Sequence, residues 1–315
     1  MKTIIISMAA CGVLAMGVSA CGGDDDDSGG SSSSSGGGDL SGTIRIDGSS
    51  TVGPFAQAAA EEFQGQNPNV KVTVGIAGTG GGFEKFCAGE TDISDASRPI
   101  EPDEADICKK NGVTYKQVQV ADDGISVVTN KSMTVDCMTT KQLKELWNEG
   151  SKVKKLSEID PKFPDTELSL FGPDTDSGTF DFFTAAINGE EGVSRKDYQP
   201  SADDNVLVQG VEGSDGGLGY FGFSYFEQNK DKLNDVAVDD GAGCITPSSE
   251  TIQSGEYKPL SRPLFMYPSG KALKQPEVKA FMDYVLANYQ AISEASQIVP
   301  MNSDQASKAK TALGG

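Results

Sequence analysis

The stretch TIRIDGSSTVGPFAQAAAEEFQ (residues 43–64) contains the pattern that decides the fold. The β-branched residues of TIRID (43–47) predict a strand, and FAQAAAEEFQ (55–64) predicts a helix. Pro54 precedes that helix and suits its first position, because the N–H group that proline lacks has no partner there. The stretch therefore predicts a strand, a turn of Ser, Thr and Gly, and then a helix.

The same alternation continues along the chain. VKVTVGIAG (70–78) and GISVVTN (124–130) predict strands, and KQLKELWNEG (141–150) predicts a helix that ends in glycine. VKAFMDYVLANYQAI (278–292) predicts a core-facing helix, because its apolar residues recur at steps of three and four. This alternation predicts an α/β fold with largely parallel sheets covered by helices. A chain of 315 residues is long enough for one large or two medium α/β domains.

The composition excludes several function classes. Acidic residues outnumber basic ones by 46 to 26, so the net charge of -20 disfavours a nucleic acid or an anionic membrane surface as partner. The chain has no histidine, which removes the Ser-His-Asp and Cys-His constellations and most zinc and copper sites. A site for a small anion must therefore be built locally.

The N-terminal segment predicts export. Residues 1–20 read as a secretory signal peptide, and the polar tract 21–42 reads as a flexible acidic and Gly/Ser-rich tether. VSAC (18–21) resembles the lipobox of bacterial lipoproteins, in which the cysteine, here Cys21, is acylated. An ordinary signal peptide with a chance cysteine is the alternative, and Cys11 is a weaker cleavage point.

Cysteines remaining after export lie in an oxidising compartment. They are Cys87, Cys108, Cys137 and Cys244, which allow three pairings. We favour Cys87 with Cys108 and Cys137 with Cys244. The first bond closes a short loop, and each bond then stays within one predicted domain.

Four turns share one local design, in which Ser, Thr or Gly follows a strand and precedes a helix. They are SSTVGP (49–54), TGGG (79–82), SRP (97–99) and DSGT (176–179). Helix starts expose N–H groups, hydroxyls add donors, and glycine lets the backbone approach a ligand, so the set predicts an anion site. Ordinary helix capping is the alternative for any one of them. A nucleotide site is disfavoured, since Phe83 replaces the last glycine of G-x-G-x-x-G and no GK[ST] occurs.

These motifs also carry a family resemblance. DGSSTVGPF (47–55), GTGGGF (78–83), DASRPI (95–100) and DSGTFDFF (176–183) resemble the substrate-binding protein of bacterial phosphate ABC importers, as do DDNVLVQGV (203–211), GLGYFGFSYF (217–226) and RPLFMY (262–267). The resemblance implies a two-lobed type II periplasmic-binding-protein fold with the ligand cleft between the lobes. Lobe I would comprise residues 43–128 plus 258–315, and lobe II residues 129–257.

The resemblance also implies the function. The protein would be a lipid-anchored, extracytoplasmic monomer without cofactor, metal or catalytic residues, which captures inorganic phosphate and delivers it to a membrane permease. The residues implied as phosphate ligands are Ser50, Thr51, Val52, Thr79, Gly80, Ser97, Arg98, Asp176, Ser177, Gly178 and Thr179. Pro173 stands where many members of that family have an arginine, which leaves Arg98 as the cation of the four motifs. We expect Arg98 to make a bidentate phosphate contact, or a salt bridge with Asp176.

Asp176 is expected to face the ligand. Phosphate at neutral pH still has a hydrogen to donate, and a carboxylate can only accept, so an aspartate favours phosphate over sulfate. Asp174 and Asp95 are alternatives, and Asp176 could instead only cap the helix. Alternative functions are binding of sulfate, molybdate or another oxyanion, a secreted metal-dependent phosphatase, and an adhesion or matrix role.

Overall fold

The computed structural model describes residues 40–175 and 177–314, so Cys21 and Asp176 lie outside the described residues. All of the described residues belong to one unit of the chain. No helix among them is long and apolar enough to cross a membrane.

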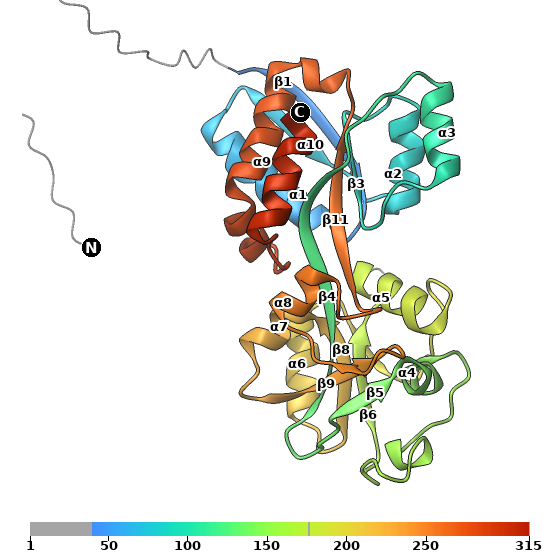
Figure 1. The fold of residues 1–315 in the computed structure, drawn as a ribbon. Helices are drawn as coiled ribbons and strands as arrows, with labels where there is room; N and C mark the ends of the chain where they lie inside the picture. The colour runs from blue at the N-terminus through green and yellow to red at the C-terminus, as the bar shows by residue number, and fades with distance from the viewer. Residues whose placement is uncertain (1–39, 176, 315) are drawn as a thin grey trace, which may run out of the picture. The chain divides into compact units, whose positions relative to one another are not determined.

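Two α/β lobes share one continuous path of strands in the order β2-β1-β3-β11-β4-β8-β6-β7 (Figure 1). The first lobe contains β1 (Gly42–Gly48), α1 (Gly53–Gln66), β2 (Val70–Val74), α2 (Gly78–Cys87), β3 (Ile93–Ala96), α3 (Pro102–Lys110), η3 (Ala272–Lys274), α9 (Pro276–Ala295) and α10 (Ser303–Gly314). The second contains β5 (Cys137–Thr139), α4 (Thr140–Trp147), η1 (Leu156–Glu158), β6 (Ser169–Pro173), α5 (Gly178–Phe183), η2 (Thr184–Asn188), β7 (Gln199–Ser201), α6 (Asp204–Glu212), β8 (Gly217–Gly222), α7 (Phe223–Gln228), β9 (Leu233–Asp239), β10 (Cys244–Ile245) and α8 (Ser249–Ser254). The strands and helices predicted from sequence are present, although β2 ends four residues earlier than the predicted strand 70–78.

Largely parallel sheets were predicted, and this is wrong: the sheet is mixed. β1 pairs in parallel with β2 and β3, and β6 pairs in parallel with β7 and β8. Each antiparallel pair that the structure describes contains β4, β9 or β11. The reason is that β4 and β11 run between the lobes in opposite directions, which a count of β–α alternation does not register.

The crossing strands β4 (Val118–Asn130) and β11 (Ser261–Pro268) connect the lobes (Figure 1). The amino-terminal half of β4 pairs with β11, and its carboxyl-terminal half pairs with β8 and β9. The hydrophobic core changes along β4 as well, since Ala121 packs in the core of the first lobe and Ile125 in the core of the second. The boundary between the two cores therefore lies on β4 between these residues.

Both favoured disulfides are present. Cys87 is bonded to Cys108, which joins the end of α2 to α3, and Cys137 is bonded to Cys244, which joins β5 to β10. Each bond lies within one lobe, as predicted.

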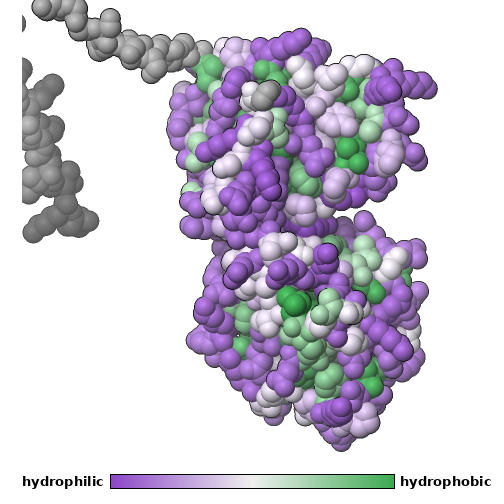
Figure 2. Space-filling view, viewed as in Figure 1, coloured by the Kyte–Doolittle hydropathy of each residue, from purple (hydrophilic) through white to green (hydrophobic). Residues whose placement is uncertain are grey.

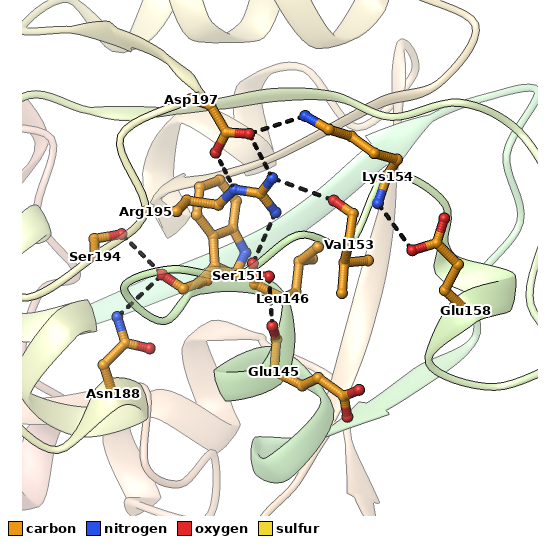
Figure 3. A network of polar contacts seen from close by, with 11 residues as sticks. Glu145, Leu146, Ser151, Val153, Lys154, Glu158, Asn188, Ser194, Arg195 and Asp197 are labelled. Carbon is orange, nitrogen blue, oxygen red and sulfur yellow. Dashed lines mark hydrogen bonds and ion pairs between the residues drawn. The ribbon is translucent and has the colours of Figure 1, made fainter.

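The buried Arg195 joins several segments of the second lobe through hydrogen bonds (Figure 3). Arg195 donates to the carbonyl oxygens of Leu146 and Val153 at 2.9 and 3.2 Å, and to both carboxylate oxygens of Asp197. Asn188, at the end of η2, donates to the Trp147 carbonyl at 3.4 Å. The network thus holds α4 against the helical segment α5–η2, which carries the predicted DSGT turn.

Hydrophilic residues cover most of the face shown in Figure 2, and the hydrophobic residues on it form small separate areas. Among the described residues, the large apolar side chains that are exposed are Ile76, Ile107 and Val206.

Candidate functional site

A cavity of about 370 Å³ lies where three of the predicted turns meet the second lobe. Its lining residues are Ser49, Ser50, Thr51, Ala77, Gly78, Thr79, Gly80, Gly81, Ser97, Arg98, Gly178, Asp181, Phe182, Ala185, Glu191 and Arg262. Of the predicted ligands, seven line it: Ser50, Thr51, Thr79, Gly80, Ser97, Arg98 and Gly178.

The turn after β1 provides hydroxyl groups. Buried Ser49 accepts hydrogen bonds from the N–H groups of Thr51 and Val52 at 3.2 and 3.4 Å, so Ser49 serves the turn itself. The Ser50 and Thr51 side chains remain at the cavity. Val52 does not line the cavity, since its side chain belongs to the core of the first lobe and its N–H is bonded to Ser49.

The start of α2 provides backbone donors. The N–H groups in the first turn of any helix have no intrahelical partner, and here this turn includes Thr79 and Gly80. No side chain caps this helix. Thr79 Oγ1 accepts from the Ser97 N–H at 3.2 Å, which joins α2 to the turn after β3. Gly82 lies behind them, and a Cβ there would come within 2.5 Å of the Gly48 Cα. Gly82 therefore lets α2 pack closely against β1.

Arg98 lines the cavity but has carboxylate partners of its own. Its Nη1 and Nη2 donate to the two carboxylate oxygens of Glu104, each at 2.8 Å, and its Nε lies 3.4 Å from Glu101. The hydrogen bond to Glu104 raises the pKa of Arg98. Its bidentate partner in the structure is therefore Glu104, six residues ahead in sequence, which the motif analysis did not consider.

The second lobe presents the start of α5. Ser177 accepts from the Thr179 N–H at 3.2 Å, and both residues line an adjoining cavity of about 310 Å³ that shares Ser50, Thr51 and Gly178 with the first. Phe180, Phe183 and Ile187 are buried and anchor this segment.

Gly178, in the second lobe, lies close against the turn after β1 of the first lobe. A Cβ built on it would lie 2.4 Å from Thr51 Oγ1, 2.6 Å from Ser50 Oγ and 2.9 Å from the Thr51 backbone nitrogen, so a larger residue would force Ser50 and Thr51 to shift.

Arg262 is the site residue that sequence reasoning missed. Its Nη2 donates to Thr51 Oγ1 at 2.8 Å and to the Gly178 carbonyl at 3.3 Å, and its Nε donates to Asp123 Oδ2 at 3.2 Å. Burial lowers the pKa of Arg262, and Asp123 opposes that shift. RPLFMY (262–267) lay within the resemblance, but no local signal connects its arginine to turns more than 80 residues away in sequence.

Carboxylates also occur at the cavities. Asp181 and Glu191 line the larger one, and Asp174 lines the adjoining one. Asp95 lines neither, and it is buried within β3. Burial, and to a lesser extent the charge of Asp47, raise the pKa of Asp95 well above its usual range. Neither of its carboxylate oxygens has a hydrogen-bond partner among the described residues. Asp95 is therefore not placed to face a ligand in these cavities.

The charged side chains at the site do not form a cationic pocket, because each arginine is paired with a carboxylate. Arg98 is paired with Glu101 and Glu104, and Arg262 is paired with Asp123. An anion would therefore depend on hydroxyl and N–H donors together with these shared cations. Within residues 40–175 and 177–314, no group of three or more Cys, Asp or Glu side chains could hold a metal ion.

Known proteins resemble this chain over most of its length. A family model for the PBP superfamily domain matches residues 33–288. Protein SphX of Synechococcus elongatus is 44% identical over 261 residues, which cover 82% of this chain and 77% of the relative. The phosphate-binding protein PstS of Staphylococcus saprophyticus is 42% identical over 246 residues, which cover 78% of this chain and 75% of the relative.

Solved structures agree with these matches. A possible phosphate-binding protein from Planctomyces limnophilus is 46% identical with a TM-score of 0.81, and the match covers 87% of this chain and 98% of that one. A putative phosphate ABC transporter substrate-binding protein from Clostridium perfringens, solved with bound phosphate, is 26% identical with a TM-score of 0.58, over 83% and 100% of the two chains. The similarities confirm both the predicted two-lobed fold and the resemblance read from the motifs.

Proposed function

The chain belongs to the PBP superfamily, in its group of phosphate-binding proteins, and we propose that it captures inorganic phosphate between its lobes and delivers it to the permease of an ABC importer. One observation carries the site assignment: Arg262, on a crossing strand, bonds both Thr51 of the first lobe and Gly178 of the second beside a cavity rich in hydroxyl and N–H donors.

The donors suit a tetrahedral anion. Thr51 Oγ1 accepts from Arg262, so the Thr51 hydroxyl hydrogen is available for another acceptor. Arg262 Nη1 has no hydrogen-bond partner among the described residues and carries two further N–H groups. Ser50 and the N–H groups of Gly80 and Gly178 add further donors, as does one of the Thr79 and Ser97 hydroxyls, which share a hydrogen bond at 3.1 Å. Together these groups can surround phosphate from several directions.

The energetics allow binding without a cationic pocket. Micromolar affinity requires about 8 kcal/mol, and each hydrogen bond to a charged group contributes roughly 1.5–3 kcal/mol. About eight such donors can together supply this binding free energy after association costs of roughly 4–15 kcal/mol are subtracted, for most values in these ranges.

The arginine roles follow from the geometry. We propose that Arg262 is the principal cation for phosphate, and that Arg98 contributes as a cavity-lining cation whose charge Glu104 shares. Of the remaining expected ligands, Ser177 and Thr179 approach from the adjoining cavity. Asp176 stays a sequence-based proposal for the carboxylate that accepts the hydrogen of phosphate.

The cellular setting is also a proposal. Cys21 would anchor an extracytoplasmic monomer to the membrane through lipid. The mostly hydrophilic face shown in Figure 2 supports a monomer. The relatives from Staphylococcus saprophyticus and Clostridium perfringens carry the names of binding proteins rather than enzymes, which favours binding over phosphatase activity.

Calorimetry on residues 40–315 with phosphate, arsenate and sulfate tests the function. We expect phosphate and arsenate to bind and sulfate to bind far more weakly. Tighter binding of sulfate would favour the alternative oxyanion, and no binding of any of the three would reject the proposal.

A further inference from the structure

Phe182 differs from the other phenylalanines of the DSGTFDFF motif. Phe180 and Phe183 are buried in the core of the second lobe, whereas Phe182 is half-buried and lines the anion cavity. Its ring lies beneath the guanidinium of Arg262, with the Arg262 Cζ atom 3.8 Å from the ring centroid. One aromatic side chain of α5 thus contacts the cation of the site.

Arg262 is held by three hydrogen-bond partners, of which the Gly178 carbonyl is one, and by an aromatic ring. Asp123 binds its Nε at 3.2 Å, Thr51 binds its Nη2 at 2.8 Å, and the Phe182 ring covers one face of the guanidinium. The stacking uses the face of the group and leaves the N–H donors, which lie in its plane, free for acceptors. The remaining in-plane edge is Nη1, which has no hydrogen-bond partner among the described residues.

Fixing this group matters because a free arginine side chain has many rotamers, and ordering it on ligand binding costs affinity. A ring at 3.8 Å attracts the cation through its quadrupole, and more strongly when the contact is shielded from water. The arginine side chain is only 17% exposed, so the shielded case applies.

We propose that Phe182 is a positioning residue for the anion site, which holds the Arg262 guanidinium so that its Nη1 edge faces the bound anion. The inference rests on the proposed function and adds a dependence of affinity on one aromatic face. Phe182 itself offers the anion no donor.

The test compares Phe182→Leu, which removes the ring, with Phe182→Tyr, which keeps it. Phe163→Leu is the matched control, since Phe163 is also half-buried against the core of the second lobe and does not line either cavity. By calorimetry with inorganic phosphate, Phe182→Leu should raise Kd by about 3- to 30-fold, the range of a shielded cation–π contact. Phe182→Tyr should restore most of that loss, and Phe163→Leu should not change Kd.

A double-mutant cycle separates positioning from general packing. In an Arg262→Gln background, Phe182→Leu should cause less than about a 2-fold further change in Kd, because the cation that the ring positions is gone. Trp147, the single tryptophan of the chain, has its ring centroid 5.9 Å from that of Phe183, which lies in α5 with Phe182. Its emission therefore reports on any displacement of α5. We expect that emission to be unchanged in Phe182→Leu.

Three results would overturn the inference: an unchanged Kd in Phe182→Leu, an equal loss in Phe182→Tyr, or the full loss persisting without Arg262. Each leaves the proposed function standing, since the unmodified protein still binds phosphate. Failure of the unmodified protein to bind phosphate would instead reject the proposed function and this inference with it.

Discussion

Arg262 and Asp123 lie directly opposite each other on β11 and β4, and Arg262 Nε donates a hydrogen bond to Asp123 Oδ2 at 3.2 Å. Arg262, which we propose as the principal cation, therefore belongs to the crossing strands. Because its Nη2 also reaches Thr51 and Gly178, one side chain connects these strands to both walls of the site.

The two arginines should contribute unequally to phosphate binding. Arg262→Ala removes a donor shared by both lobes and leaves Asp123 without its partner, so we expect a loss of at least about 2 kcal/mol in calorimetric binding free energy. Arg98→Ala should cost less, because Glu104 already occupies its two terminal nitrogens. A larger loss in Arg98→Ala would return the principal role to Arg98.

Gly178→Ala should hold the lobes apart. The added methyl group would lie 2.4 Å from Thr51 Oγ1, and such overpacking costs about 1–3 kcal/mol. Phosphate affinity should fall accordingly, and X-ray scattering should give a larger radius of gyration than the unmodified protein at saturating phosphate. Gly65→Ala is the control, since a Cβ there meets no atom within 4 Å. Equal radii and affinities for all three proteins would contradict the close-approach argument.

Asp176→Asn should change selectivity more than affinity. An amide can turn its NH2 group toward a fully deprotonated anion, so sulfate binding should rise relative to phosphate. Capping alone predicts no change, because asparagine caps helices about as well as aspartate. Competition between the two anions at one ionic strength measures the ratio, and a parallel Asp181→Asn variant tests the carboxylate that lines the cavity from α5. A constant ratio in Asp176→Asn would leave Asp176 as a cap.

Asp122→Asn should stabilise the protein at high pH. Burial raises the pKa of Asp122 to about 7, against hydrogen bonds from Gln305 and Gln119. Since an unfolded aspartate has a pKa near ~3.9, the folded state binds more protons between these values, and the free energy of unfolding falls as pH rises toward 7.

Asparagine keeps an acceptor for Gln119 and Gln305 but has no charge to bury. Its stability advantage should therefore be small at pH 4 and grow by up to about 1.4 kcal/mol per pH unit toward pH 7. Urea unfolding across this range measures the difference, with exposed Asp231→Asn as control. A pH-independent difference would contradict the buried proton.

Cys21→Ser should release the protein from the membrane. If Cys21 is acylated, removing its thiol removes the anchor, and the protein should move from the membrane to the soluble fraction. Cys11→Ser controls for the other cysteine of the N-terminal segment. Membrane association that persists in Cys21→Ser would contradict the lipobox assignment.

The sequence by itself determined the local features of this protein. The strand β1, the helix α1 and the apolar face of α9 follow from residue periodicity and from Pro54, which act over a few residues. The turns at Ser50, Thr79 and Ser97 could be identified because helix starts and glycine have short-range signatures, and the resemblance placed them in one cleft. The Arg98–Glu104 pair could also have been predicted from the sequence, since its members are only six positions apart.

Only the tertiary structure showed that a second cation, Arg262, reaches the cleft beside Arg98, and how closely the walls of the cleft approach. Arg262 and Asp123 are 139 residues apart, and Arg262 and Thr51 are 211 residues apart. Their contacts depend on two strands crossing in opposite directions, a relationship without any local sequence signal. The same crossing made the sheet mixed rather than largely parallel, and it brought Gly178 against Thr51, where the space left for a side chain is set by the partner lobe and not by the turn itself.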